Sequence, residues 1–136
     1  MASFVKINSF VEFLAEKRIN LGSDQLTIAL TNTAHTSTWD ELADLTQISY
    51  TNLSTRNITT SSSTQTTGTY KLVLADLVLT STGGTTGPFR YVYIYDSTAV
   101  GGDLICYFDY GSALTLQDGD TFTIDFDATN GVLQIV

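Results

Sequence analysis

The sequence of 136 residues contains one cysteine and one histidine. Cys106 cannot form a disulfide within the chain, and a single thiol is a poor basis for a thiolate metal site. His35 has no second histidine and no suitably placed cysteine with which to build a zinc site or a catalytic triad. We therefore predict that Cys106 is a core side chain, that His35 is a surface loop residue, and that the chain is not an enzyme.

Charge is also scarce, and basic charge above all. Charged residues make up 15% of the chain, and only 6 are Lys or Arg against 14 Asp or Glu, which gives a net charge of −8. The basic residues form no stripe along the sequence, so neither nucleic acid nor an anionic membrane surface is expected as a partner. Uncharged polar residues, Thr and Ser above all, take the place of charged residues. Such a surface can be buried against a protein at low desolvation cost.

Long hydrophobic runs are missing as well. No apolar stretch approaches the ~20 residues that a membrane helix needs. The N-terminus also lacks the charged segment and apolar run of a signal peptide, so we expect synthesis and assembly in a cytoplasm. A hydrophobic content of 43% is nevertheless ample for a folded core, and the length suits one domain.

The first residues are predicted to form an N-terminal arm, residues 1–7, ahead of a single domain, residues 8–136. Phe4, Val5 and Ile7 make this arm apolar, and segments of this kind are often ordered only by a neighbouring molecule. These three residues are therefore candidates for an interface. Deleting the arm should weaken assembly without unfolding the domain.

A short helix is predicted to follow the arm. Ser9 and Glu12 have the spacing of a capping box, which would start the helix at this point. Lys17 and Arg18 would lie in its last turn, where positive charge suits the helix dipole. Apolar residues at helical spacing, Phe10 among them, would face the core.

The remainder of the chain is predicted to be mainly β. Residues 25–31, 70–79, 89–95 and 121–127 are strand-like: most alternate apolar and polar residues, and 70–79 is apolar enough to be buried on both faces. A strand over 104–108 is expected to break at residues 110–112. The Asn130-Gly131 pair is the strongest hairpin signal, so residues 132–136 are predicted to pair back on 121–127. Short strands joined by Gly and Asn turns indicate an antiparallel β-sandwich or jelly-roll-like fold with the helix on one end or face.

Two strand features allow more than one interpretation. The segment 50–68 is rich in Thr, Ser and Asn and specifies no register, which predicts an edge strand or a long mobile loop. Tyr91, Tyr93 and Tyr95 share one face of a strand. They either fill the core or form an interface between subunits, where tyrosine is enriched.

The acidic C-terminal region is the one place where the sequence suggests a metal. Asp125, Asp127 and Asn130 offer hard oxygen ligands of the kind that Ca²⁺ prefers. Their spacing differs from that of the twelve-residue calcium loop, so a solvated or partner-facing strand surface is the favoured interpretation. A hydrolase that uses these carboxylates is the last hypothesis, because no tryptophan-lined sugar cleft is evident. No cofactor is predicted.

The order of several motifs resembles that of small virion structural proteins of tailed bacteriophages. The motifs are SDQLTIALTN (residues 23–32), YIYD (93–96), GDLICYFDYG (102–111) and the acidic stretch 118–135. The match spans roughly residues 8–32 and 70–136, and the middle of the chain departs from it. The resemblance implies a β-sandwich without catalytic residues that decorates or cements a capsid, or that lies in the tail or neck.

A structural virion protein is therefore the expected function. It would stabilise a phage capsid by bridging neighbouring subunits, with the major capsid protein and copies of itself, often as a trimer, as partners. Its location would be the capsid surface of the virion. The alternative is a structural protein of the tail, neck or fibre, or a receptor- or glycan-binding module, for which Trp39 and the Asn- and Thr-rich loops are candidates.

Overall fold

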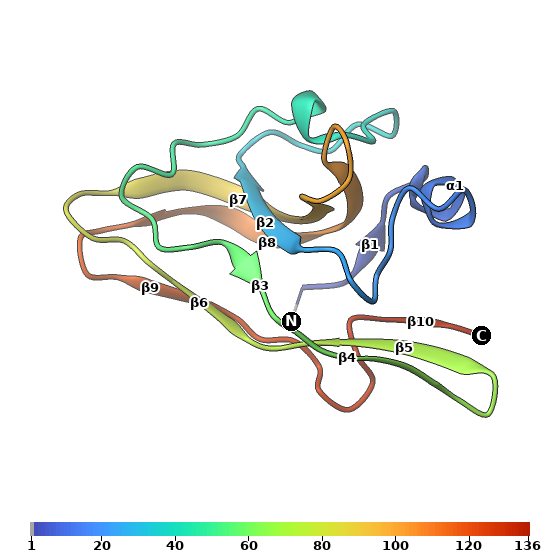
Figure 1. Cartoon of the computed structure of the whole chain (residues 1–136). Helices are drawn as coiled ribbons and strands as arrows, with labels where there is room; N and C mark the ends of the chain where they lie inside the picture. The colour runs from blue at the N-terminus through green and yellow to red at the C-terminus, as the bar shows by residue number, and fades with distance from the viewer. Residues whose placement is uncertain (1) are drawn as a thin grey trace.

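The computed structural model describes residues 2–136 and consists mainly of antiparallel β-strands in two facing layers (Figure 1). The predicted fold class, mainly β with a short N-terminal helix, is confirmed. The upper layer is a five-stranded sheet in the order β1 (Val5–Lys6), β8 (Asp103–Leu116), β7 (Thr86–Asp96), β2 (Leu26–Thr31) and β3 (Asn57–Ile58). The lower layer contains β10 (Leu133–Ile135), β5 (Thr69–Leu74) and β4 (Thr60–Thr66) in one sheet, and β6 (Leu77–Thr80) with β9 (Thr121–Ile124) in another.

Strand β2 lies between β7 and β3 in the main sheet, and all six of its residues are buried. Its alternating sequence predicts a strand with one exposed face, whereas both faces are covered. The reason is the chain that follows. Ile48 donates its N–H to Leu30 O at 3.1 Å, and Tyr50 Oη accepts from Leu30 N at 2.9 Å. The segment after β2 therefore folds back on it.

The hairpin of β7 and β8 forms the centre of the upper layer. Tyr93 pairs with Tyr107, and the register shifts between Phe89 and Tyr91, where β8 carries extra residues. Gly111 lies in this irregular part of β8 with a φ of +98°, and its N–H donates to Asp109 Oδ1 at 2.8 Å. A glycine tolerates this conformation without strain, so the strand continues to Leu116. The predicted break at residues 110–112 is therefore a bulge.

The predicted N-terminal arm is part of the domain. Strand β1 pairs with β8, with Val5 opposite Tyr107, and Ile7 donates its N–H to Ile105 O at 3.0 Å. The Ile7 side chain is completely buried, whereas Phe4 and Val5 are 36% and 39% exposed. Met1 lies outside the described residues. Because a deletion of residues 1–7 would remove the buried Ile7 and the pairing of β1, we now expect it to destabilise the domain, contrary to the prediction from the sequence.

Helix α1 (Phe10–Ala15) buries Phe10 and Phe13, as its apolar spacing predicts. The predicted capping box is wrong, because Ser9 has helical backbone angles and its side chain makes no cap hydrogen bond. The helix also ends earlier than expected. Lys17 has a φ of +69°, which places it and Arg18 beyond the last turn.

The C-terminal strands pair differently from the prediction. Residues 121–124 pair with β6, and residues 133–135 pair with β5 instead of returning along β9. Asp127 accepts the N–H groups of Thr129 and Asn130, and Gly131 donates to Asp127 O, so the residues around Asn130 do form a turn. The chain leaves this turn toward Leu72, to which Val132 donates its N–H at 2.8 Å. The hairpin prediction is wrong because the chain that leaves the turn pairs with β5 and not with β9.

The Thr-rich segment 50–68 contains β3 and β4, each of which lies at the edge of its sheet. Of the two alternatives for this segment, the edge strand is confirmed. Within residues 2–136, no helix has the length and apolar character required to cross a membrane.

Candidate functional site

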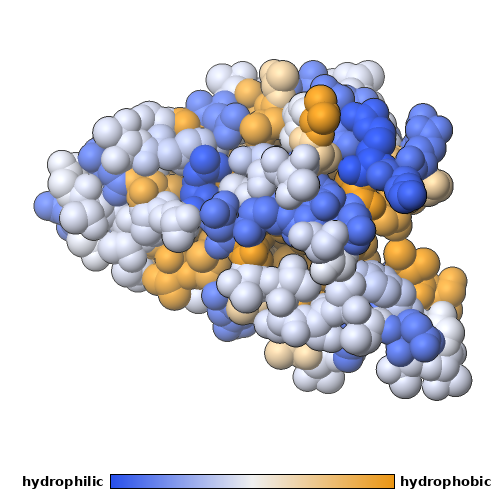
Figure 2. All heavy atoms as spheres, in the orientation of Figure 1, coloured by the Kyte–Doolittle hydropathy of each residue, from blue (hydrophilic) through white to orange (hydrophobic). Residues whose placement is uncertain are grey.

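An apolar cleft of about 400 Å³ lies where the N-terminal residues meet the middle of β8 and the segment from β9 to Val132. Most of its walls are aromatic or aliphatic, and they include Phe4, Phe108, Tyr110, Phe122, Phe126 and Val132. Figure 2 shows apolar atoms in the space between the two layers, while much of the remaining face is polar. A largely apolar concavity with few polar groups is typical of a binding site.

The aromatic residues of the cleft are held in place by contacts with the core. Phe4 meets Phe108 edge-on with ring centroids 6.1 Å apart, and Tyr110 meets Phe122 in the same way at 5.5 Å. Phe122 in turn lies edge-on to the fully buried Phe89 at 5.3 Å. Phe4 is 36% exposed and Tyr110 is 50% exposed. Both therefore present apolar surface to solvent while their rings contact neighbouring aromatic side chains.

Strand edges border the cleft. Phe4 directly precedes β1, and Val132 directly precedes β10; each of these strands lies at the edge of its sheet. Within residues 2–136, no strand pairs with the outer side of either one. An extended segment of another protein could add to such an edge through backbone hydrogen bonds and insert a side chain into the cleft.

The calcium candidates Asp125, Asp127 and Asn130 lie on or near the rim of this cleft. Both oxygens of Asp127 are already occupied: Oδ1 accepts from the backbone of Thr129 and Asn130, and Oδ2 accepts from Asn130 Nδ2 at 2.8 Å. These hydrogen bonds lower the pKa of Asp127. Asn130 turns its nitrogen toward Asp127, and Asp125 is exposed. The geometry is that of a turn stabilised by a carboxylate. In the part of the chain that the structure describes, no three His, Cys, Asp or Glu side chains form a metal-binding group.

The tyrosine row of β7 belongs largely to the interior. Tyr93 is fully buried, Tyr95 is 7% exposed, and Tyr91 is half-buried. Tyr93 stacks on Tyr107 with ring centroids 5.2 Å apart. Burial, together with Tyr107 and Tyr91, raises the pKa of the Tyr93 hydroxyl. Of the two hypotheses for this row, the geometry favours core packing over an interface.

His35 is not the simple surface residue that its loop position predicts. Its ring stacks on Tyr107 at 4.5 Å and meets Trp39 edge-on at 5.7 Å. Its Nδ1 lies 2.8 Å from Tyr93 Oη, and partial burial lowers the pKa of the imidazole. The sequence gives no local indication of this cluster, because Tyr93 lies 58 residues away. Cys106, by contrast, is fully buried, as predicted, and burial raises the pKa of its thiol.

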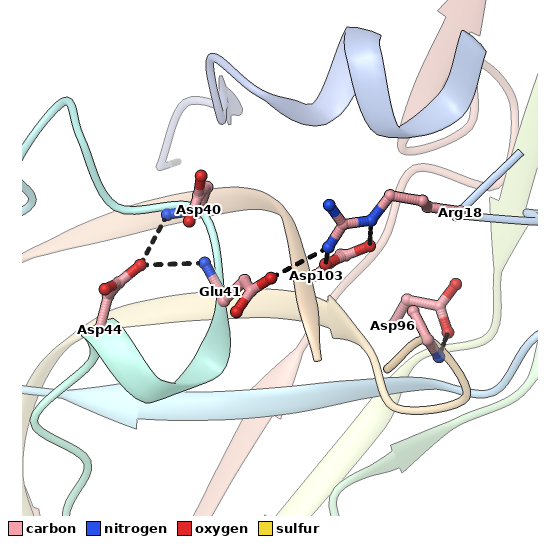
Figure 3. A network of polar contacts seen from close by, with 7 residues as sticks. Arg18, Asp40, Glu41, Asp44, Asp96 and Asp103 are labelled. Carbon is pink, nitrogen blue, oxygen red and sulfur yellow. Dashed lines mark hydrogen bonds and ion pairs between the residues drawn. The ribbon is translucent and has the colours of Figure 1, made fainter. Parts of the chain in front are cut away.

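A polar network joins the end of the helix region to the start of β8 (Figure 3). Arg18 Nε donates to Asp103 Oδ2 at 3.0 Å, and Arg18 Nη2 donates to Glu41 Oε1 at the same distance. Hydrogen bonds to Asp103 and then to Glu41 raise the pKa of Arg18. Because Asp103 is completely buried, Arg18 supplies the charge that a buried carboxylate requires. We interpret this network as structural.

A second buried carboxylate, Asp96, has no such partner. Its Oδ1 accepts the backbone N–H groups of Thr98 and Ala99 at 2.9 and 3.1 Å. Its Oδ2 is buried and has no hydrogen-bond partner among residues 2–136. Burial and the adjacent Asp24 raise the pKa of Asp96 to about 7. Sequence reasoning missed this site, because no spacing rule relates Asp24 to Asp96.

Comparison of the chain with protein-family models, with curated proteins and with solved structures gives no match.

Proposed function

We propose that the chain is a structural virion protein that decorates a phage capsid and stabilises it by bridging neighbouring capsid subunits. The observation that carries this proposal is the apolar cleft between the two layers, bordered by the edge strands β1 and β10. The virion setting is supported by the order of the motifs at residues 23–32, 93–96, 102–111 and 118–135, which resembles that of small tailed-phage structural proteins. The partners are the major capsid protein and copies of this chain.

The binding energy comes from apolar burial in the cleft. Burying an aromatic or large aliphatic side chain from a partner contributes about 1.5–3 kcal/mol. An added strand at β1 or β10 fixes the direction of the partner segment, because backbone hydrogen bonds determine its register. A modest affinity at one site suffices on a capsid, since each copy that contacts two subunits gains from the high local concentration of the second contact.

The surface charge also suits a protein partner. A net charge of −8 opposes binding to the packaged genome and favours a partner surface that carries Lys or Arg. Asp125 is an exposed carboxylate on the cleft lining, where it can meet such a residue. Because exposed charges are screened, this contribution should weaken as the salt concentration rises.

The proposal is tested by co-sedimentation with purified particles that lack the chain. We expect saturable binding with a dissociation constant of about 1–10 μM for a single contact, or tighter where two subunits are bridged. Decorated particles should also release their genome at a higher temperature than bare ones. Absence of binding to particles, at low and at moderate salt, would remove the basis of the proposal.

A receptor- or glycan-binding role in a tail fibre is the second candidate. The observation in its favour is the aromatic cluster of Trp39, His35 and Tyr107, in which Trp39 is half-buried. These rings contact one another, which leaves less of their faces for a sugar. Binding on a glycan array that disappears in Trp39→Ala would favour this role over capsid decoration.

A further inference from the structure

Strand β4 differs from the other edge strands in its length. It has 7 residues and lies at the edge of the lower sheet, where β5 is its one partner within residues 2–136. The other edge strands are shorter: β1 and β3 have 2 residues each, β10 has 3, and β6 and β9 have 4 each. Proteins commonly keep edge strands short, because their unpaired backbone groups can accept a further strand. Strand β4 is therefore the longest open edge in the described part of the chain.

The sequence of this edge lacks the charges and the proline that usually prevent further pairing. Residues 57–70 contain no Asp, Glu, Lys, Arg or Pro. A register shift between Thr60 and Ser62 disturbs the start of the strand, so regular pairing with β5 covers residues 62–66. Threonine, which is common in this segment, favours the extended backbone of a strand. Residues 62–66 thus form a regular edge to which another strand can be added.

The turn after β4 determines which backbone groups point outward. Thr67 and Gly68 connect β4 to β5 with φ values of +52° and +83°, as in a type I′ turn. The two residues that flank such a turn exchange hydrogen bonds within the hairpin, and antiparallel pairing then alternates along the strands. Ser63 and Gln65 consequently turn their N–H and C=O groups away from β5. Figure 1 shows that the tip of this hairpin reaches away from the five-stranded sheet.

We propose that two copies of this chain associate by pairing their β4 strands in antiparallel orientation about a two-fold axis at Thr64. Ser63 then lies opposite the partner's Gln65, and the two residues exchange backbone hydrogen bonds. Each Thr64 faces its own copy across the axis. A contact between two identical edges is self-complementary, so the assembly closes at two chains.

The charge distribution favours a second copy as the occupant of this edge. With a net charge of −8, two chains repel one another over most of their surfaces. Residues 57–70 carry no charge, so this edge can approach its own copy without bringing carboxylates together. A strongly basic partner would find no acidic side chain on β4 to recognise. Pairs of Thr and Ser side chains across the two strands add to the backbone hydrogen bonds.

The position of β4 relates this association to the proposed function. The order of the lower sheet is β10, β5, β4, so the edge that borders the apolar cleft lies on the opposite side from β4. A pair of chains joined through β4 therefore keeps both clefts open and can contact two capsid subunits at once. This bridging role rests on the proposed function, whereas the pairing is a property of the isolated chain.

The test is sedimentation equilibrium of the purified wild-type chain. One strand edge buries little surface, so we expect a weak dimer with a dissociation constant on the order of 100 μM. The chain should be monomeric at about 5 μM and mostly dimeric at about 500 μM. Addition of salt should leave the association unchanged or strengthen it, because salt screens the repulsion between two acidic chains.

Thr64→Glu is the primary variant. Thr64 is exposed and pairs with Lys71 on β5, so a glutamate meets a positive neighbour within its own chain and the hairpin is retained. Across the two-fold axis, however, two carboxylates come together, and dimerisation should weaken by about tenfold or more. Thr38→Glu is the matched control. It makes the same change at an exposed threonine in the loop after β2 and should dimerise within about twofold of the wild type.

Gln65→Pro provides an independent variant, because it removes an outward N–H that the pairing with β5 does not use. It should also weaken dimerisation by about tenfold or more, with an unchanged circular dichroism spectrum. The proposal is overturned if the wild-type chain stays monomeric at about 500 μM or forms a trimer. It is equally overturned if Thr64→Glu dimerises as well as Thr38→Glu does. A monomeric chain that still binds particles would contradict the pairing through β4 and leave the proposed function standing.

Discussion

Replacement of Phe4 with aspartate is expected to weaken binding to capsid particles by about 100-fold, or about 2.7 kcal/mol, which is the size of an interface hot spot. Phe4 forms part of the cleft wall and keeps 36% of its surface exposed beside Phe108. A carboxylate at this position removes apolar contact area and must be desolvated when a partner fills the cleft. Co-sedimentation isotherms of the variant and the wild type measure the loss.

Val100→Asp is the control for this prediction. Val100 is 93% exposed in the loop before β8 and is not part of the cleft lining. The substitution adds the same charge to an exposed apolar residue, so its affinity for particles should remain within about twofold of the wild type. Circular dichroism should show that both variants remain folded at the temperature of the binding assay, although Phe4→Asp loses part of its packing against Phe108. Equal losses in the two variants would show that net charge, and not the cleft, determines binding.

Phe89→Ala is expected to lower the free energy of unfolding by about 3–5 kcal/mol, which is the usual cost of truncating a fully buried phenylalanine. Phe89 lies on β7 of the upper layer, is completely buried, and contacts Phe122 on β9 of the lower layer. The cavity left by its ring would lie between the two layers, where the backbone of neither sheet can readily collapse. Urea unfolding followed by circular dichroism measures the change.

Val78→Ala serves for comparison because Val78 lies on β6 of the same lower layer and is 51% exposed. Its truncation should change the free energy of unfolding by no more than about 0.5 kcal/mol. A loss below about 1 kcal/mol in Phe89→Ala would mean that the layers do not share one core at this position.

Local periodicity was sufficient to predict several elements of the fold. The alternation in residues 26–31 and 89–95 marks strands that the structure contains as β2 and β7. The spacing of Phe10 and Phe13 correctly predicts the buried face of α1. In these cases local spacing is enough to identify the element, although both faces of β2 are covered in the structure.

Strand pairing was much less accessible from the sequence. The Asn130-Gly131 turn exists, yet β10 pairs with β5 and β9 pairs with β6. A turn motif fixes the local backbone but not the strand that the chain meets next, because that choice depends on the burial of residues far away. For the same reason the apolar segment before α1 is an edge strand of the main sheet, with Ile7 in the core.

The candidate site was predictable only in part. Phe4 is recognisable as an apolar residue near an end of the chain, but its neighbours Phe108 and Phe122 come from strands more than 100 residues further on. The contacts of His35 with Tyr93 and Tyr107 likewise join segments far apart in the sequence. These contacts depend on strand pairing, which places Tyr93 opposite Tyr107 and brings β1 alongside β8.

The copy number of the chain in purified virions tests the central claim most directly. Quantitative mass spectrometry of particles, with the major capsid protein as the internal standard, gives this ratio. Capsid decoration predicts on the order of hundreds of copies per particle, in fixed proportion to the capsid subunits and following their symmetry. About six or twelve copies would contradict decoration and favour a tail or neck position. Absence of the chain from purified particles would contradict a structural virion role altogether.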